Sequence, residues 1–168
     1  MPNNQDNNFK HLMYALGGFA AGTFLVKNQL DASKRSRAEI DAPEECEEVC
    51  NEIAELLQGW EPGEDCESED ELTRDLADYL EYQSEWEIEI YPDSPEGKPD
   101  ILIGDLLALE LKVNPGKGER DRLIGQCAGY SRLWVTWAIV IDSSESKIGR
   151  LVDLLEDKGL EHIAVWSF

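Results

Sequence analysis

Basic residues are scarce in this sequence. Its 168 residues include 15 Lys and Arg against 36 Asp and Glu, a net charge of −21. Residues 41–72 carry fourteen acids and no base. This balance argues against a protein that coats nucleic acid through a generally basic surface, because every phosphate contact needs a cation nearby. A small basic site stays compatible, since residues 112–132 carry five basic and two acidic side chains. A dense carboxylate surface is also typical of proteins that stay solvated at high salt.

Cysteine and histidine are also few, with four and two copies. Cys46 and Cys50 lie four residues apart on a predicted helix, beside Val49, where cysteine acts as a small apolar residue. A zinc site would need two further ligands at suitable spacing, and His11 and His162 lie far away in the sequence. We therefore expect reduced cysteines in a cytoplasmic protein rather than a disulfide framework.

Long apolar runs are absent except near the N-terminus. Residues 12–26 contain no charge, but fifteen residues fall short of the roughly 20 that a membrane-spanning helix needs. If Lys27 reaches the membrane surface, the apolar segment extends over residues 12–30. Gly18 and Gly22 form a GxxxG spacing, which favours close helix pairs and hence a homodimer. Two interpretations stay open: an anchor that tethers the protein to the inner face of the membrane, or an apolar helix that packs on the domain or a partner.

The chain divides into three parts. Residues 1–30 form the apolar N-terminal segment, and residues 31–66 form a linker with an acidic helix. That helix is predicted over residues 43–57, because a proline stands near its first turn and glutamates follow early. Residues 67–168 form the main domain.

The main domain has the pattern of an α/β fold. Its hydrophobic periodicity predicts the order helix, three strands, helix, strand, helix, strand. We expect a mixed sheet flanked by helices and preceded by the apolar and acidic helices. The expected elements are a helix from residue 69, a strand at 86–91, two strands within 100–113 joined at 104–105, a helix at 118–133, a strand at 134–141, a helix at 146–158 and a strand at 162–168.

Charged side chains interrupt the third predicted strand. Glu110 and Lys112 share one face of it with Leu106 and Ala108. Burying a carboxylate and an ammonium costs free energy unless they pair or bind something. Asp100 opens the preceding strand and comes within reach if the two strands form a hairpin. Two carboxylates beside a lysine can bind a hard divalent cation and position a water.

This arrangement resembles the PD-(D/E)xK nuclease superfamily. Pro99-Asp100, a gap of nine residues and Glu110-Leu111-Lys112 reproduce its signature. The resemblance covers residues 69–168 and implies a restriction-endonuclease-like fold of the order αβββαβαβ.

Two further elements carry the resemblance. Gln126 and Tyr130 match the QxxxY element of the RecB-like branch, on the helix after the lysine strand. Glu69 fits the acidic residue that these proteins often carry upstream, and it shares a helix face with Leu72 and Leu76.

The resemblance implies a nuclease that depends on Mg²⁺ or Mn²⁺ and hydrolyses phosphodiester bonds, in DNA or alternatively RNA, in repair, restriction or recombination. The implied metal ligands are Asp100, Glu110 and Glu69. The implied catalytic residues are Lys112, which orients and helps to deprotonate the attacking water, Gln126, which steers the lysine or the water, and Glu69. The implied nucleic-acid contacts are Lys117, Arg120, Arg122 and Tyr130.

Two other interpretations compete with this one. The chain could be a catalytically silent relative that binds or scaffolds, although a binding module has no need of two acids and a lysine together. It could also act in recognition or assembly at a membrane, with the nuclease-like domain supplying a partner surface.

Overall fold

The computed structural model describes residues 43–63 and 66–168. Its helices and strands alternate from β3 to the end of the chain. In chain order they are α2 (Pro43–Gly59), α3 (Glu69–Gln83), β1 (Ile88–Ile90), β2 (Ile101–Ile103), β3 (Leu107–Val113), α4 (Lys117–Tyr130), β4 (Val135–Ile141), α5 (Glu145–Asp157) and β5 (Ala164–Ser167).

The strands form one five-stranded mixed sheet in the order β1-β2-β3-β4-β5. β1, β2 and β3 are antiparallel neighbours, whereas β3, β4 and β5 run parallel. The parallel strands are joined through α4 and α5, because a parallel pair needs a crossover connection. β3 and β4 pair over seven residues each, and all of β4 is buried, as is typical of a central parallel strand.

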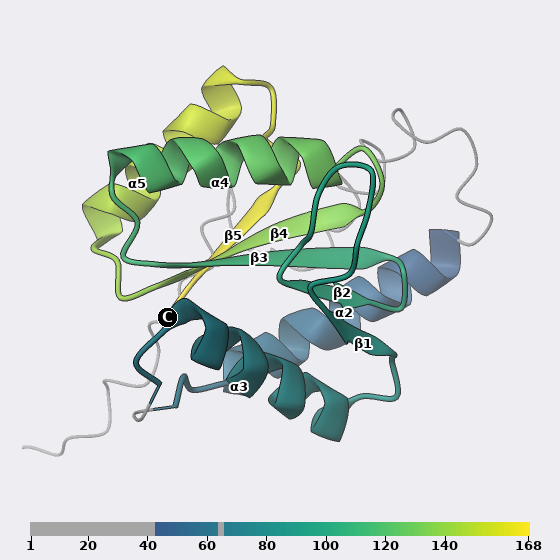
Figure 1. Ribbon diagram of the computed structural model, residues 1–168. Helices are drawn as coiled ribbons and strands as arrows, with labels where there is room; N and C mark the ends of the chain where they lie inside the picture. Colours follow the sequence, from purple (N-terminus) through teal and green to yellow (C-terminus); the bar gives the residue numbers. More distant parts are fainter. Residues whose placement is uncertain (1–42, 64–65) are drawn as a thin grey trace, which may run out of the picture.

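Helices cover both faces of the sheet (Figure 1). α2 and α3 lie on one face, where they share a hydrophobic cluster with side chains from β2 to β5. α4 and α5 lie on the other face and pack on a second cluster with β4 and β5. The alternation of side chains along each strand supplies both clusters, so the molecule has three layers with the sheet in the middle.

α2 belongs to this core, although the sequence analysis placed it in a segment before the domain. Cys46 and Cys50 are buried on its inner face, as predicted, together with Ile53. Trp86 Nε1 also donates a hydrogen bond to Glu52 of this helix at 2.8 Å. A chain that began at residue 60 would therefore expose one side of the hydrophobic core.

The α/β class, the mixed sheet and the predicted element order after residue 67 are confirmed. The first strand is shorter than predicted, because Trp86 turns toward α2 and Tyr91 adopts φ 54°. In the described part of the chain, no helix is long and apolar enough to cross a membrane. The predicted apolar segment at residues 12–30 lies outside the described residues.

Candidate active site

A notch in the sheet creates the candidate site. β2 pairs with β3 only from Leu107 to Leu109, whereas β3 continues to Val113 with β4 on its other side. Where β2 is missing, the backbone N–H of Leu111 donates instead to Asp100 Oδ2 at 2.7 Å. Asp100 immediately precedes β2, so the short strand brings its carboxylate beside Glu110 on β3.

Three carboxylates surround the ammonium of Lys112. Its Nζ lies 2.7 Å from Glu69 Oε1, 3.0 Å from Glu110 Oε1 and 3.9 Å from Asp100 Oδ2. The ammonium also donates to the backbone carbonyl of Leu111. The contact with Glu69 joins residues 43 positions apart in the sequence. The structure therefore brings together the four residues that the sequence analysis placed at the centre of the site.

Glu110 is the least satisfied member of this group. It is 1% exposed, and neither carboxylate oxygen accepts a hydrogen bond of good geometry from the described residues, although Lys112 lies nearby. Burial, followed by the negative charge of Asp100, raises the pKa of Glu110 from 4.5 to about 7, against the opposing charge of Lys112. A buried carboxylate that has one ammonium beside it and an oxygen without a hydrogen bond is costly, and native proteins rarely keep one without a role.

Burial and neighbouring charges also shift the pKa values of Asp100 and Lys112. Burial also raises the pKa of Asp100, while Lys112 and the hydrogen bond from Leu111 act in the opposite direction. Burial lowers the pKa of Lys112, but the charges of Glu110 and Asp100 and the hydrogen bond to Glu69 outweigh it, so the net pKa is raised. Lys112 is therefore an ammonium at neutral pH, and Asp100 and Glu110 titrate as a pair.

The first turn of α3 positions Glu69. Ser68 caps this helix, because its hydroxyl accepts a hydrogen bond from the backbone N–H of Glu71 at 3.2 Å. Tyr91 fastens the same turn to β2: its hydroxyl donates to Asp70 Oδ1 at 2.8 Å, and its N–H donates to the carbonyl of Asp100 at 3.1 Å. The sequence analysis missed Tyr91, because only its left-handed backbone at φ 54° brings it there.

α4 covers the other side of the notch. Gln126 and Tyr130 face the sheet as predicted, and their side chains meet at 3.5 Å. The carbonyl oxygen Oε1 of Gln126 is buried without a hydrogen-bond partner in the described structure. Tyr130 donates its hydroxyl to the carbonyl of Lys98 at 2.8 Å, which holds the loop before Asp100 against α4.

The predicted nucleic-acid contacts fall into two groups. Lys117 and Arg122 are exposed on the first turns of α4, and Arg122 is close enough to Asp100 to help lower its pKa. Arg120 is half-buried and donates to the carbonyl of Pro115 at 3.1 Å. Tyr130, the fourth predicted contact, is 2% exposed, and its hydroxyl braces the loop before Asp100.

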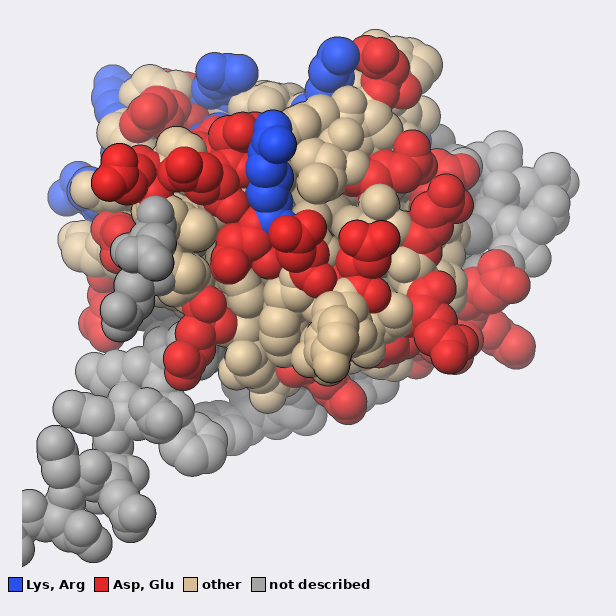
Figure 2. Space-filling model, turned by 60° about the horizontal axis from the view of Figure 1, so that its bottom comes forward, with Lys and Arg blue, Asp and Glu red and all other residues tan. Residues whose placement is uncertain are grey.

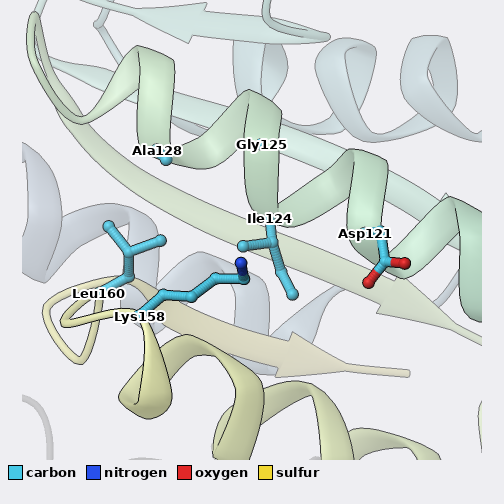
Figure 3. Close-up of a pocket in the computed structure, with 6 residues that line it drawn as sticks. All are labelled: Asp121, Ile124, Gly125, Ala128, Lys158 and Leu160. Carbon is cyan, nitrogen blue, oxygen red and sulfur yellow. The ribbon is translucent and has the colours of Figure 1, made fainter.

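A pocket of about 530 Å³ lies away from this cluster, between α4 and the turn after α5 (Figure 3). Its lining includes Asp121, Gly125 and Lys158, and none of the site residues named above. The pocket is therefore separate from the candidate site.

The carboxylates at the site suit a cation such as Mg²⁺, provided that the protein supplies few of its ligands and water supplies the rest. Among the described residues, no group of three or more His, Cys, Asp or Glu is arranged to hold a metal. Mg²⁺, however, commonly takes one or two carboxylates and keeps several waters. Asp100 and Glu110 supply two; Oε2 of Glu110 accepts no hydrogen bond from the described residues, whereas Oε1 stands 3.0 Å from the ammonium of Lys112. In comparisons with protein-family models, curated proteins and solved structures, nothing matched the chain.

Proposed function

We propose that this protein is a metal-dependent nuclease that hydrolyses phosphodiester bonds in DNA. The observation that carries the proposal is the buried carboxylate of Glu110: its Oε1 stands 3.0 Å from the ammonium of Lys112, and its Oε2 accepts no hydrogen bond within the described structure. A core of this kind has no structural need for the pair, because apolar residues of similar volume stabilise a fold as well or better. The resemblance to the PD-(D/E)xK nucleases implies that the same residues catalyse phosphodiester hydrolysis.

Asp100 and Glu110 would hold Mg²⁺ or Mn²⁺ at the notch. When bound, such an ion polarises a phosphoryl oxygen and lowers the pKa of a coordinated water. Its positive charge would also offset the like charges of the two carboxylates, which raise the pKa of Glu110 in its absence. Of the two side chains, that of Asp100 is the more accessible, at 13% exposure against 1% for Glu110, so a phosphate would approach from its side.

Lys112 would act as a charged donor rather than as a base. Its raised pKa keeps it an ammonium at neutral pH, so it can donate hydrogen bonds to the attacking water and to the phosphate oxygens. Glu69 holds the ammonium at 2.7 Å and fixes its direction. This assigns Glu69 to positioning Lys112; because Lys112 is already protonated, the proton of the attacking water would pass to bulk solvent.

A nuclease assay on the full chain tests the proposal. We expect cleavage of DNA with Mg²⁺ or Mn²⁺, none with EDTA, and a loss of at least about 10³-fold in Asp100→Asn. The amide oxygen of this variant can still accept the N–H of Leu111, so the variant should fold. Asp93→Asn is the matched control, because Asp93 is exposed and pairs only with Lys98 among the described ion pairs. Equal activity of Asp100→Asn and the wild type would contradict the proposal.

A silent binding module is the second candidate. One observation favours it: Lys112 already neutralises part of the acidic cluster, with 2.7 Å to Glu69 and 3.0 Å to Glu110. Calorimetric titration with Mn²⁺ separates the two candidates. The nuclease requires binding that is lost in Asp100→Asn, whereas the silent module shows neither binding nor cleavage.

A further inference from the structure

The two walls of the notch carry opposite charge. α3 forms one wall, because Glu69 in its first turn reaches Lys112 at 2.7 Å. α4 forms the other, because it packs on β3 and carries Arg122 close to Asp100. These walls set which nucleic acid can bring a phosphate to the cluster.

The α3 wall is acidic. Glu67, Asp70 and Glu71 are exposed around its first turn, and the side chain of Glu69 is 42% exposed. Arg74 is the nearest base on this helix, and it pairs with Asp70 at 3.1 Å. Figure 2 shows acidic side chains spread widely over one face of the molecule, with few basic ones between them. A phosphate that approached this wall would meet several carboxylates and one base, Arg74, which is already paired with Asp70.

The α4 wall carries the cations. Lys117 and Arg122 are exposed on its first two turns, and the half-buried Arg120 lies between them in the sequence. Of the two acids in the same turns, Glu119 is engaged with the helix start, where it accepts the N–H of Gly116 at 2.7 Å. Asp121, the other acid, is exposed, but the three bases outnumber it, so α4 is the wall on which a phosphate backbone would meet cations.

We propose that the candidate site takes a single strand of nucleic acid and rejects an intact duplex. In B-DNA the second backbone lies across a groove about 6 to 12 Å wide. A duplex that set one phosphate at Asp100 and Glu110 would thus bring its other backbone against one wall, and only one wall carries cations. A single strand has no second backbone to place. This inference rests on the proposed function.

The test uses the full chain and one oligonucleotide, offered alone and annealed to its complement. With Mg²⁺ or Mn²⁺ at low salt, we expect the single strand to be cleaved at least about tenfold faster. Because the Debye length falls from about 10 Å at 0.1 M salt to 3 Å at 1 M, this preference should shrink as salt is added. A preference that grew with salt, or equal cleavage of both substrates at low salt, would overturn the inference and leave the nuclease intact.

A pair of variants tests the α3 wall directly. Glu67→Gln with Asp70→Asn removes two charges, and the amide oxygen that replaces the carboxylate at position 70 can still accept the Tyr91 hydroxyl. We expect the preference to narrow by about threefold or more, because the duplex gains more than the single strand. Asp153→Asn with Glu156→Gln is the matched control: it removes two exposed charges from α5. An equal effect of both pairs would mean that net charge alone acts, which contradicts the inference.

Anisotropy binding of the same two oligonucleotides separates this inference from the proposed function. Binding that favours the single strand, without cleavage of either substrate, would overturn the nuclease and support the strand preference of the walls. Cleavage of both substrates without strand preference would support the nuclease and overturn the strand preference.

Discussion

The two faces of β3 are equally buried but differ in chemistry. Toward α2 and α3 the strand presents Leu107, Leu109 and Leu111, each fully buried. Toward α4 it presents Glu110 and Lys112, at 1% and 6% exposure. Equal burial therefore does not mean that two side chains stabilise the fold equally. The apolar face is stabilised by packing, whereas the polar face holds charges whose burial the fold itself does not require.

The apolar face should give the largest effect on stability. We expect Leu109→Ala to lower the free energy of unfolding by about 3 kcal/mol, because it leaves a cavity at the centre of the core. Urea denaturation measures the loss. Leu154→Ala is the control, since Leu154 is only partly buried on α5 and should cost much less. Equal losses would mean that the packing under β3 is no tighter than at the edge of the second cluster.

A substitution on the polar face should change the free energy of unfolding in the opposite direction. We expect Glu110→Gln to raise the free energy of unfolding at pH 8 by about 2 kcal/mol in metal-free protein, although it abolishes activity. The pKa of Glu110 is about 7 in the folded state and near its ordinary 4.5 in the unfolded state. Between these values the folded protein holds the Glu110 proton more often than the unfolded chain does, so the contribution of Glu110 to stability falls as pH rises from about 4.5 to 7.

Denaturation at pH 5 and pH 8 measures this difference. The variant should gain little at pH 5, where Glu110 is largely protonated in the folded protein, and gain most at pH 8. Mn²⁺ at pH 8 should stabilise the wild type and leave Glu110→Gln unchanged, because a ligand stabilises only the state that binds it. A variant that is less stable than the wild type at pH 8 would show that Glu110 supports the fold through its charge.

The contrast between the faces also explains what the sequence could predict. Alternation along residues 107–113 reveals two faces, because side chains in a strand have a period of two. Glu110 and Lys112 were identified because charge on a buried strand is conspicuous. Helical spacing likewise predicted the inner face of α2, with Cys46 and Cys50.

The features that the sequence could not predict depend on tertiary geometry. The notch exists because β2 begins only at Ile101, opposite Leu109, and no local pattern fixes that starting point. The contact between Glu69 and Lys112 spans 43 positions, and Tyr91 reaches α3 only through an unusual backbone angle. We predicted the helix within residues 31–66 as part of a segment before the domain, whereas packing of its inner face against the sheet makes it part of the core.

The smallest expected effect concerns Tyr130, at the border between the two kinds of environment. It is 2% exposed like the apolar core, but its hydroxyl donates to the carbonyl of Lys98 at 2.8 Å. We expect Tyr130→Phe to lower the free energy of unfolding by about 1 kcal/mol, because that carbonyl loses its donor. Tyr82→Phe, at a side chain that is 86% exposed, should change nothing measurable in the same denaturation experiment. If Tyr130→Phe instead left stability intact and reduced cleavage, the hydroxyl would act on the substrate, and the bracing role assigned to it would be wrong.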